Sequence, residues 1–233
     1  MQAVLDAAAY DAEQLTAGGV DAIIVENYGD APFFPDHVPA ITTAAITAAV
    51  LHVRSVSHLK VGVNVLRNDA AAALAVCAAT GAAFIRINVH SGAMLTDQGW
   101  ITGRAHQTLR QRTQLGLEAA ILADVFVKHA VPAAGLTIEE AARDTWERGC
   151  ADALILSGSG TGVQTSSADI ERVKTAVPES VVFVGSGLTA QNAAALLRLA
   201  DGAIVGSSLK TDGRPESPVS LQEVQRLVEA ARS

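Results

Sequence analysis

Short apolar runs alternate with longer stretches rich in alanine and leucine along the whole chain. Short runs of β-branched and other apolar residues are typical of buried parallel strands, whereas apolar residues spaced three and four positions apart are typical of helices. The pattern predicts strands at 20–26, 60–66, 83–89, 118–127, 152–156, 181–184 and 203–205. Because helices separate these strands, a parallel sheet in an α/β protein is expected.

Capping residues mark the boundaries of the helices between these strands. Helices are expected at 1–16, 41–56, 70–79, 109–116, 138–148, 169–176, 190–200 and from 221 onward. Their expected caps are Gly18-Gly19 at the end of the first helix, and Asp69, Thr137 with Glu140, Thr189, and Ser220 with Glu223 at the starts of later ones. A long loop is expected after the strand at 83–89, up to Gly103.

The junction between a helix and the next strand recurs along the chain. At 81–85, 149–154 and 200–204 a helix ends in or near a glycine, and a small residue then leads into an apolar run. This is the joint of a βαβ unit, repeated. No linker, low-complexity tract or charge run interrupts the series. Residues 1–233 are therefore expected to form one domain.

Glycine and serine form the turns that follow the last strands. Such turns expose backbone N–H groups beside helix N-termini, an arrangement that suits a phosphate. In (β/α)8 barrels, phosphate commonly sits after strands seven and eight. We therefore expect a TIM (β/α)8-type barrel that lacks its first strand. The expected phosphate-binding residues are Gly158, Gly185, Ser186, Gly187, Gly206, Ser207 and Ser208.

Composition narrows the choice of partners. The chain has 233 residues, is 49% hydrophobic and carries a net charge of −7, which argues against nucleic acid or an anionic membrane surface as its main partner. It has no apolar run of the roughly 18 residues that a transmembrane helix requires, and no signal-peptide pattern. Cys77 and Cys150 are expected to be small buried thiols, so a cytoplasmic location is expected.

Polar residues interrupt the apolar strands near their carboxyl ends, where the active sites of such barrels lie. The candidate catalytic residues are Glu26, Asn64, Arg86, Asp124 and Lys128. Buried polar groups need partners, so a ring of them at one mouth favours an active site. Lys128 shares a face with Asp124 if that strand continues.

Glu26, Asn64 and Lys128 also have structural interpretations. Glu26 could form an ion pair with Arg86, Asn64 could brace neighbouring loops, and Lys128 could be a solvated loop lysine. The run Gly185-x-Gly187-x-x-Ala190 matches a dinucleotide fingerprint, but no acidic residue ends the next strand, and the phosphate interpretation is preferred. The histidines show no metal-ligand spacing, so neither a metal nor a cofactor is expected.

Four motifs, in this order, carry a resemblance. They are Val25–Phe33, Gly62–Asp69, Ala123–Ala130 and Val205–Lys210. With them the chain resembles the BtpA/SgcQ family over nearly its whole length. The resemblance implies a ribulose-phosphate-binding barrel. Relatives begin with a further strand and a turn of the type His-x-x-Pro-Leu-Pro-Gly, so the resemblance implies a chain truncated at its N-terminus, either by a start assigned too far downstream or by trimming. Such a chain is expected to be poorly stable or self-associating.

Two function classes follow from the residues and the resemblance. The first is an enzyme that binds a phosphorylated sugar or related metabolite, with isomerase, epimerase and aldolase chemistry all open. The second is a non-catalytic assembly or stability factor, because the family takes its name from a cyanobacterial protein needed for photosystem I to accumulate. A homo-oligomer is compatible with either class.

Overall fold

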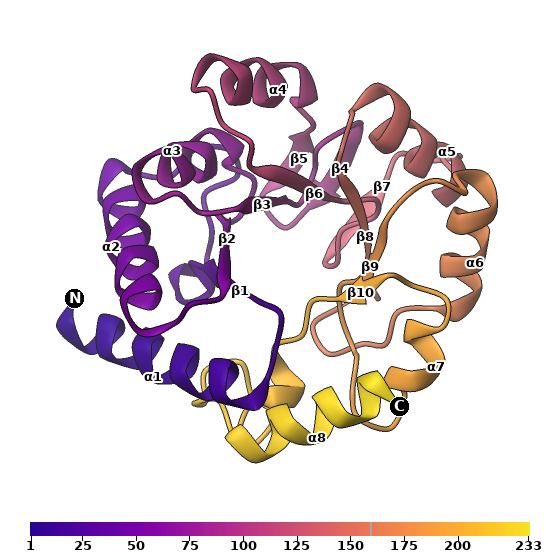
Figure 1. Cartoon of the computed structure of the whole chain (residues 1–233). Coiled ribbons are helices and arrows are strands. Elements are labelled where there is room, and N and C mark those ends of the chain that lie inside the picture. Colours follow the sequence, from indigo (N-terminus) through magenta and orange to yellow (C-terminus); the bar gives the residue numbers. More distant parts are fainter. Residues whose placement is uncertain (159) are drawn as a thin grey trace.

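The computed structural model of the chain describes residues 1–158 and 160–233, and its strands form a parallel sheet curled into an incomplete barrel (Figure 1). The strands are neighbours in chain order, as expected from the repeated βα pattern. They are β1 (Ala22–Glu26), β2 (Lys60–Asn64), β3 (Phe84–Ile87), β6 (Ala120–Asp124), β8 (Ala153–Leu156), β9 (Val182–Val184) and β10 (Gly202–Ala203). The predicted α/β barrel with seven strands is confirmed.

Helices surround the sheet on its outer face (Figure 1). They are α1 (Gln2–Gly18), α2 (Ala40–Val56), α3 (Ala70–Thr80), α4 (Ala105–Gln114), α5 (Ile138–Arg143), α6 (Ser167–Ala176), α7 (Ala193–Leu197) and α8 (Leu221–Arg232). Short turns of helix lie at η1 (Tyr28–Asp30), η2 (Asp144–Arg148) and η3 (Ser207–Leu209). None of the helices in the described part of the chain is long and apolar enough to cross a membrane.

Most of the predicted caps are present. Gly19 ends α1 in the left-handed region at φ 88°, the Asp69 carboxylate accepts from the Ala72 N–H, and Thr137 and Glu140 form a full capping box. The expected cap at Thr189 is wrong, because α7 begins only at Ala193 and the segment before it is a turn. Cys77 is buried as expected, whereas Cys150, in the turn before β8, is exposed.

The expected loop between β3 and Gly103 contains a hairpin instead. β4 (Ala93–Thr96) and β5 (Gly99–Thr102) pair antiparallel, and β7 (Ala130–Pro132) adds a third strand from a distant part of the chain. The buried side chains of Met94 and Ile101 pack against Val89 and Val127. This small apolar cluster stabilises the hairpin. The alternation of apolar and polar residues in the two hairpin strands is too short to stand out in the sequence.

The barrel is closed by helices at the seam between its first and last strands. β1 pairs only with β2, and β10 only with β9, among the described strands. At this seam α1 and α8 lie side by side (Figure 1). Lys210 Nζ lies 2.6 Å from the Asp11 carboxylate, and the Val219 N–H donates to the same side chain. An apolar cavity of about 600 Å³ lies between the two strand edges.

Glycines in two strands make room for aromatic rings in this part of the barrel. A Cβ atom at Gly62 would lie 2.1 Å from the Phe84 ring, and one at Gly202 would lie 2.7 Å from the Phe183 ring. Phe84 and Phe183 both line the seam cavity and pack on the buried cluster of Leu122, Ala153 and Ile155. The aromatic rings therefore fill the barrel only because the neighbouring strands lack side chains there.

Candidate functional site

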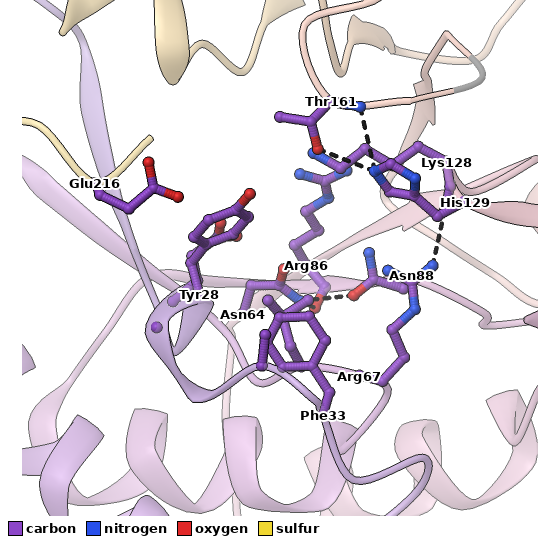
Figure 2. Close-up of a pocket in the computed structure, with 14 residues that line it drawn as sticks. Tyr28, Phe33, Asn64, Arg67, Arg86, Asn88, Lys128, His129, Thr161 and Glu216 are labelled. Atoms are coloured by element: carbon purple, nitrogen blue, oxygen red, sulfur yellow. Dashed lines mark hydrogen bonds between the residues drawn. The ribbon is translucent and has the colours of Figure 1, made fainter. Parts of the chain in front are cut away.

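A cavity of about 340 Å³ lies beyond the carboxyl ends of β1, β2 and β3 (Figure 2). Four of the five predicted catalytic residues, Glu26, Asn64, Arg86 and Lys128, line it, and the fifth, Asp124, lies behind Arg86. The remaining lining residues are Tyr28, Gly29, Ala31, Phe33, Leu66, Arg67, Asn88, His129, Thr161 and Glu216. Residues from distant parts of the chain thus meet at the mouth of the barrel, as the strand ends indicated.

Arg86 is held by Asp124. Arg86 Nε and Nη2 each donate to one carboxylate oxygen of Asp124 at 2.9 Å, and the Ser157 hydroxyl donates to the same carboxylate. Burial lowers the pKa of Arg86, whereas the charge and hydrogen bonding of Asp124, and then the charge of Glu26, raise it, so that the pKa lies above its ordinary value. The ion pair of Arg86 is with Asp124, and the alternative of a Glu26–Arg86 ion pair is wrong. Asp124 is engaged by these donors, which leaves Glu26 as the accessible carboxylate at this end of β1.

Asn64 braces the cavity wall and also leaves one atom free. Its Nδ2 group donates to the Arg86 carbonyl oxygen at 3.0 Å and to Asn88 Oδ1 at 3.1 Å, which fixes the orientation of the amide. The buried Oδ1 atom of Asn64 has no hydrogen-bond donor among the described residues. An unsatisfied acceptor in a cavity wall is a position where a ligand hydroxyl can donate.

Lys128 lines the cavity, but its backbone is not part of the strand that the sequence predicted. β6 ends at Asp124, so Lys128 belongs to the loop after the strand, and the expected continuation of the strand is wrong. Its amine has no hydrogen bond or ion pair with any described residue. Burial lowers the pKa of Lys128, and the positive charge of Arg86 lowers it further. A greater share of neutral amine makes this lysine a better nucleophile or base.

Arg67 is a site residue that the sequence analysis did not single out. It lies in the loop after β2, is only 5% exposed, and lines the same cavity. Its Nη2 donates to the Lys128 carbonyl oxygen at 2.7 Å, and burial lowers its pKa. The sequence feature that could have identified Arg67 is its position three residues beyond the end of β2, because βα loops carry the functional groups of such barrels.

His129 and Thr161 join two loops above the cavity. The Thr161 N–H donates to His129 Nε2 at 3.2 Å, and the Thr161 hydroxyl lies 3.0 Å from the same nitrogen. Because Nε2 accepts from the N–H group, the proton of the neutral ring lies on Nδ1. Burial and then the charge of Lys128 lower the pKa of His129. The pair positions the Lys128 loop against the loop after β8.

The charges of the cavity are unevenly distributed. Figure 2 shows Lys128 and His129 on the side opposite Tyr28 and Glu216, with Arg86 between them. Cationic groups therefore gather on one side and a carboxylate lies on the other. Among the described residues, no group of three or more histidine, cysteine, aspartate or glutamate side chains has an arrangement that could hold a metal ion.

None of the seven predicted phosphate-binding residues lines this cavity. At the turn after β9, Ser186 Oγ accepts from the Gly158 N–H at 2.7 Å and donates to the Val163 carbonyl oxygen. A Cβ atom at Gly187 would lie 2.3 Å from Gln164, so the loop after β8 packs closely on this turn. At the turn after β10, the Ser208 hydroxyl donates to the Leu188 carbonyl oxygen, and the space at Gly206 is open.

Comparison with solved structures supports the barrel architecture. The chain superposes on N-(5'-phosphoribosyl)anthranilate isomerase from Pyrococcus furiosus with a TM-score of 0.60, at 15% identity, covering 95% of this chain and 92% of that one. At this identity the similarity shows a shared fold alone. It places the described cavity at the end of a TIM-barrel sheet.

Comparison of sequences identifies the family. The chain is 45% identical to the photosystem I biogenesis protein BtpA of Synechocystis, over 99% of this chain and 80% of that protein. It is 33% identical to the putative sgc region protein SgcQ of Escherichia coli, over 98% of this chain and 85% of that protein. The BtpA family model matches residues 1–233. The chain therefore belongs to the BtpA family.

Proposed function

We propose that the protein binds a phosphorylated sugar or related metabolite at the mouth of the barrel and acts on its carbonyl group. The observation that carries the proposal is the unpaired, partly buried amine of Lys128 in one cavity with the carboxylate of Glu26. Burial lowers the pKa of Lys128, which favours the neutral amine that carbonyl chemistry requires. The volume of about 340 Å³ suits a small metabolite.

Two reaction types use these residues. In an aldolase-type reaction, the neutral Lys128 amine would attack the carbonyl carbon, and water would leave as the imine forms. In an isomerase- or epimerase-type reaction, Glu26 would remove a proton beside the carbonyl. Arg86, and Lys128 in its protonated form, would then stabilise the negative charge that develops on the carbonyl oxygen.

The phosphate of the ligand is assigned to the turns after β9 and β10. The turn at Gly206 is the more favourable of the two, because no atom of the described residues, apart from its two chain neighbours, lies within 4 Å of the Cβ position there. The Ser207 hydroxyl has no hydrogen bond with any described residue and is available to donate. The solved barrel compared above is named for a phosphoribosyl compound, which supports a phosphorylated ligand in the same fold.

Assembly of a protein complex is the second candidate function. It is favoured by the name of the relative with 45% identity, a photosystem I biogenesis protein. A protein with this role would need no ligand in the cavity, and residues on the outer surface of the helices would bind its partner. The polar groups that converge on the cavity are better explained by the first proposal.

Thermal shifts with a library of phosphorylated sugars and their unphosphorylated counterparts test the first proposal. Phosphorylated compounds are expected to raise the melting temperature of the wild-type protein. Gly206→Asp should abolish this shift by placing a carboxylate at the turn. The matched variant Gly206→Ala should retain it, since a Cβ atom meets no neighbour there.

Trapping with borohydride then separates the reaction types. A carbonyl compound that raises the melting temperature should become attached to Lys128 if an imine forms, and Lys128→Arg should abolish the attachment. Binding without attachment would indicate proton transfer by Glu26. If no phosphorylated compound raises the melting temperature, the metabolite proposal is wrong.

A further inference from the structure

Arg67 is a buried cation without an ionic partner in the described part of the chain. The residue is 5% exposed, and its guanidinium donates to the Lys128 carbonyl oxygen. Asp97 and Asp124 are the carboxylates near enough to raise its pKa, and Arg86 opposes them. Asp124 is engaged by Arg86, and Asp97 forms no ion pair with Arg67. A buried charge without a partner is costly, so a binding partner of opposite charge is expected.

The free donors of Arg67 match a planar anion. A guanidinium has five N–H donors in a rigid fork, and among the described residues only the Lys128 carbonyl oxygen accepts from it, at Nη2. The fork fits the two oxygens of a carboxylate side by side. The charge to be balanced at Arg67 is the single positive charge of its guanidinium. A carboxylate supplies that single negative charge.

Asn64 restricts where such an anion can lie. Both protons of its Nδ2 group are used, so the atom it offers to a ligand is the acceptor Oδ1. An oxygen acceptor repels an anion and accepts from a hydroxyl. The polar wall of the cavity therefore offers a hydroxyl position at Asn64 and an anion position at Arg67.

We propose that Arg67 binds a carboxylate of the ligand, so that the preferred ligands are phosphorylated sugar acids rather than neutral sugar phosphates. The proposal rests on the proposed function for the phosphate end of the ligand, at the turns after β9 and β10. The carboxylate lies at Arg67 beside the Lys128 backbone, and a hydroxyl of the same molecule donates to Asn64 Oδ1. Arg67 thus determines specificity within the family of phosphorylated ligands.

Matched pairs of linear compounds provide the test. Each pair differs only in a carboxylate against a hydroxymethyl group: 3-phosphoglycerate and glycerol 3-phosphate, 4-phosphoerythronate and erythritol 4-phosphate, and 6-phosphogluconate and glucitol 6-phosphate. Calorimetry on the full chain gives the Kd of each. In at least one pair, the acid is expected to bind about tenfold more tightly than the alcohol.

Variants test whether Arg67 causes the tighter binding of the acids. Arg67→Gln should remove the tenfold advantage of the acid and leave the affinity for the alcohol unchanged. Arg67→Lys, which keeps the charge but lacks the fork, should restore part of the advantage. Arg104→Gln is the control, because Arg104 pairs with Asp36 and does not line the cavity. Arg104→Gln should bind the acids more tightly than the alcohols to the same extent as the wild type does.

The outcomes separate the two proposals. If wild-type protein binds the alcohols as tightly as the acids, the carboxylate site is wrong while the phosphate proposal stands. The carboxylate site is also wrong if Arg67→Gln weakens the binding of the acid and of the alcohol equally while its melting temperature is retained. If none of the six compounds binds, the carboxylate proposal fails together with the phosphate proposal on which it rests.

Discussion

Asp124 binds Arg86 through two hydrogen bonds of 2.9 Å each, and the two side chains are 0% and 4% exposed. The residues lie on adjacent parallel strands, with Arg86 opposite Leu122, so that Asp124 is two positions farther along the same face. Arg86 lines the cavity, and Asp124 lies behind it and keeps it charged. Ser157 adds a third hydrogen bond to the carboxylate.

Asp124→Asn should destabilise the protein strongly. It leaves the Arg86 charge buried without an ionic partner, and breaking a buried pair in this way costs about 3–5 kcal/mol. Urea unfolding followed by circular dichroism measures the change. The control is Glu139→Gln, which breaks the more exposed pair with Arg172 and should cost about 1 kcal/mol or less. Equal effects of the two variants would contradict the buried role of the pair.

Lys128→Met should stabilise the protein while preventing ligand attachment. The pKa of Lys128 is lowered in the folded state, so the folded protein binds the proton less tightly than the unfolded chain does. At neutral pH the protonated amine therefore reduces stability, and this cost disappears as pH rises through the folded pKa toward 10.5. We expect a melting temperature raised by about 2 °C or more at pH 7.

The pH dependence of this effect provides the check. The difference in melting temperature between Lys128→Met and wild type should decrease as pH rises from 7 through the folded pKa toward 10.5, above which both states have lost the proton. Lys60→Met, at the exposed start of β2, is the matched control. A difference that grows with pH, or a destabilised Lys128→Met at pH 7, would show that the amine is stabilised by its surroundings.

Thr161→Val should loosen the loops above the cavity. It removes the hydroxyl contact with His129 Nε2 but keeps the backbone N–H that donates to the same nitrogen. Loss of one such hydrogen bond costs about 0.5–1.5 kcal/mol. Hydrogen exchange at Thr161 and Val163 should become faster, and exchange in β2 should not change. Unchanged exchange at both residues would mean that the contact does not hold the loop.

The seam between β1 and β10 should promote self-association. Two strand edges and an apolar cavity of about 600 Å³ lie there, and unpaired edges readily pair with another chain. Sedimentation velocity should show mass increasing with concentration for the wild type. Ile204→Lys places a charge in the seam and should give a monomer. A wild type that stays monomeric at all concentrations would contradict this prediction.

The sequence by itself determined the strands, the helices and their caps, because these depend on local patterns. The alternation of apolar runs and glycine turns is enough to specify parallel βα units, and the residues at the strand ends then face one mouth. Glu26, Asn64 and Arg86 line the cavity for this reason. Expectations failed where the local signal was short, as at the hairpin of β4 and β5 and at Thr189.

Only the tertiary structure decided which polar groups meet. Arg86 pairs with Asp124 and not with Glu26, because strand register and burial bring those two side chains together. The positions of Arg67 and Lys128 depend on loops after strand ends, whose paths no periodicity describes. Packing of the loop after β8 on Ser186 and Gly187 likewise depends on contacts between distant segments. Local patterns encode elements, whereas partners of charged side chains follow from how those elements pack.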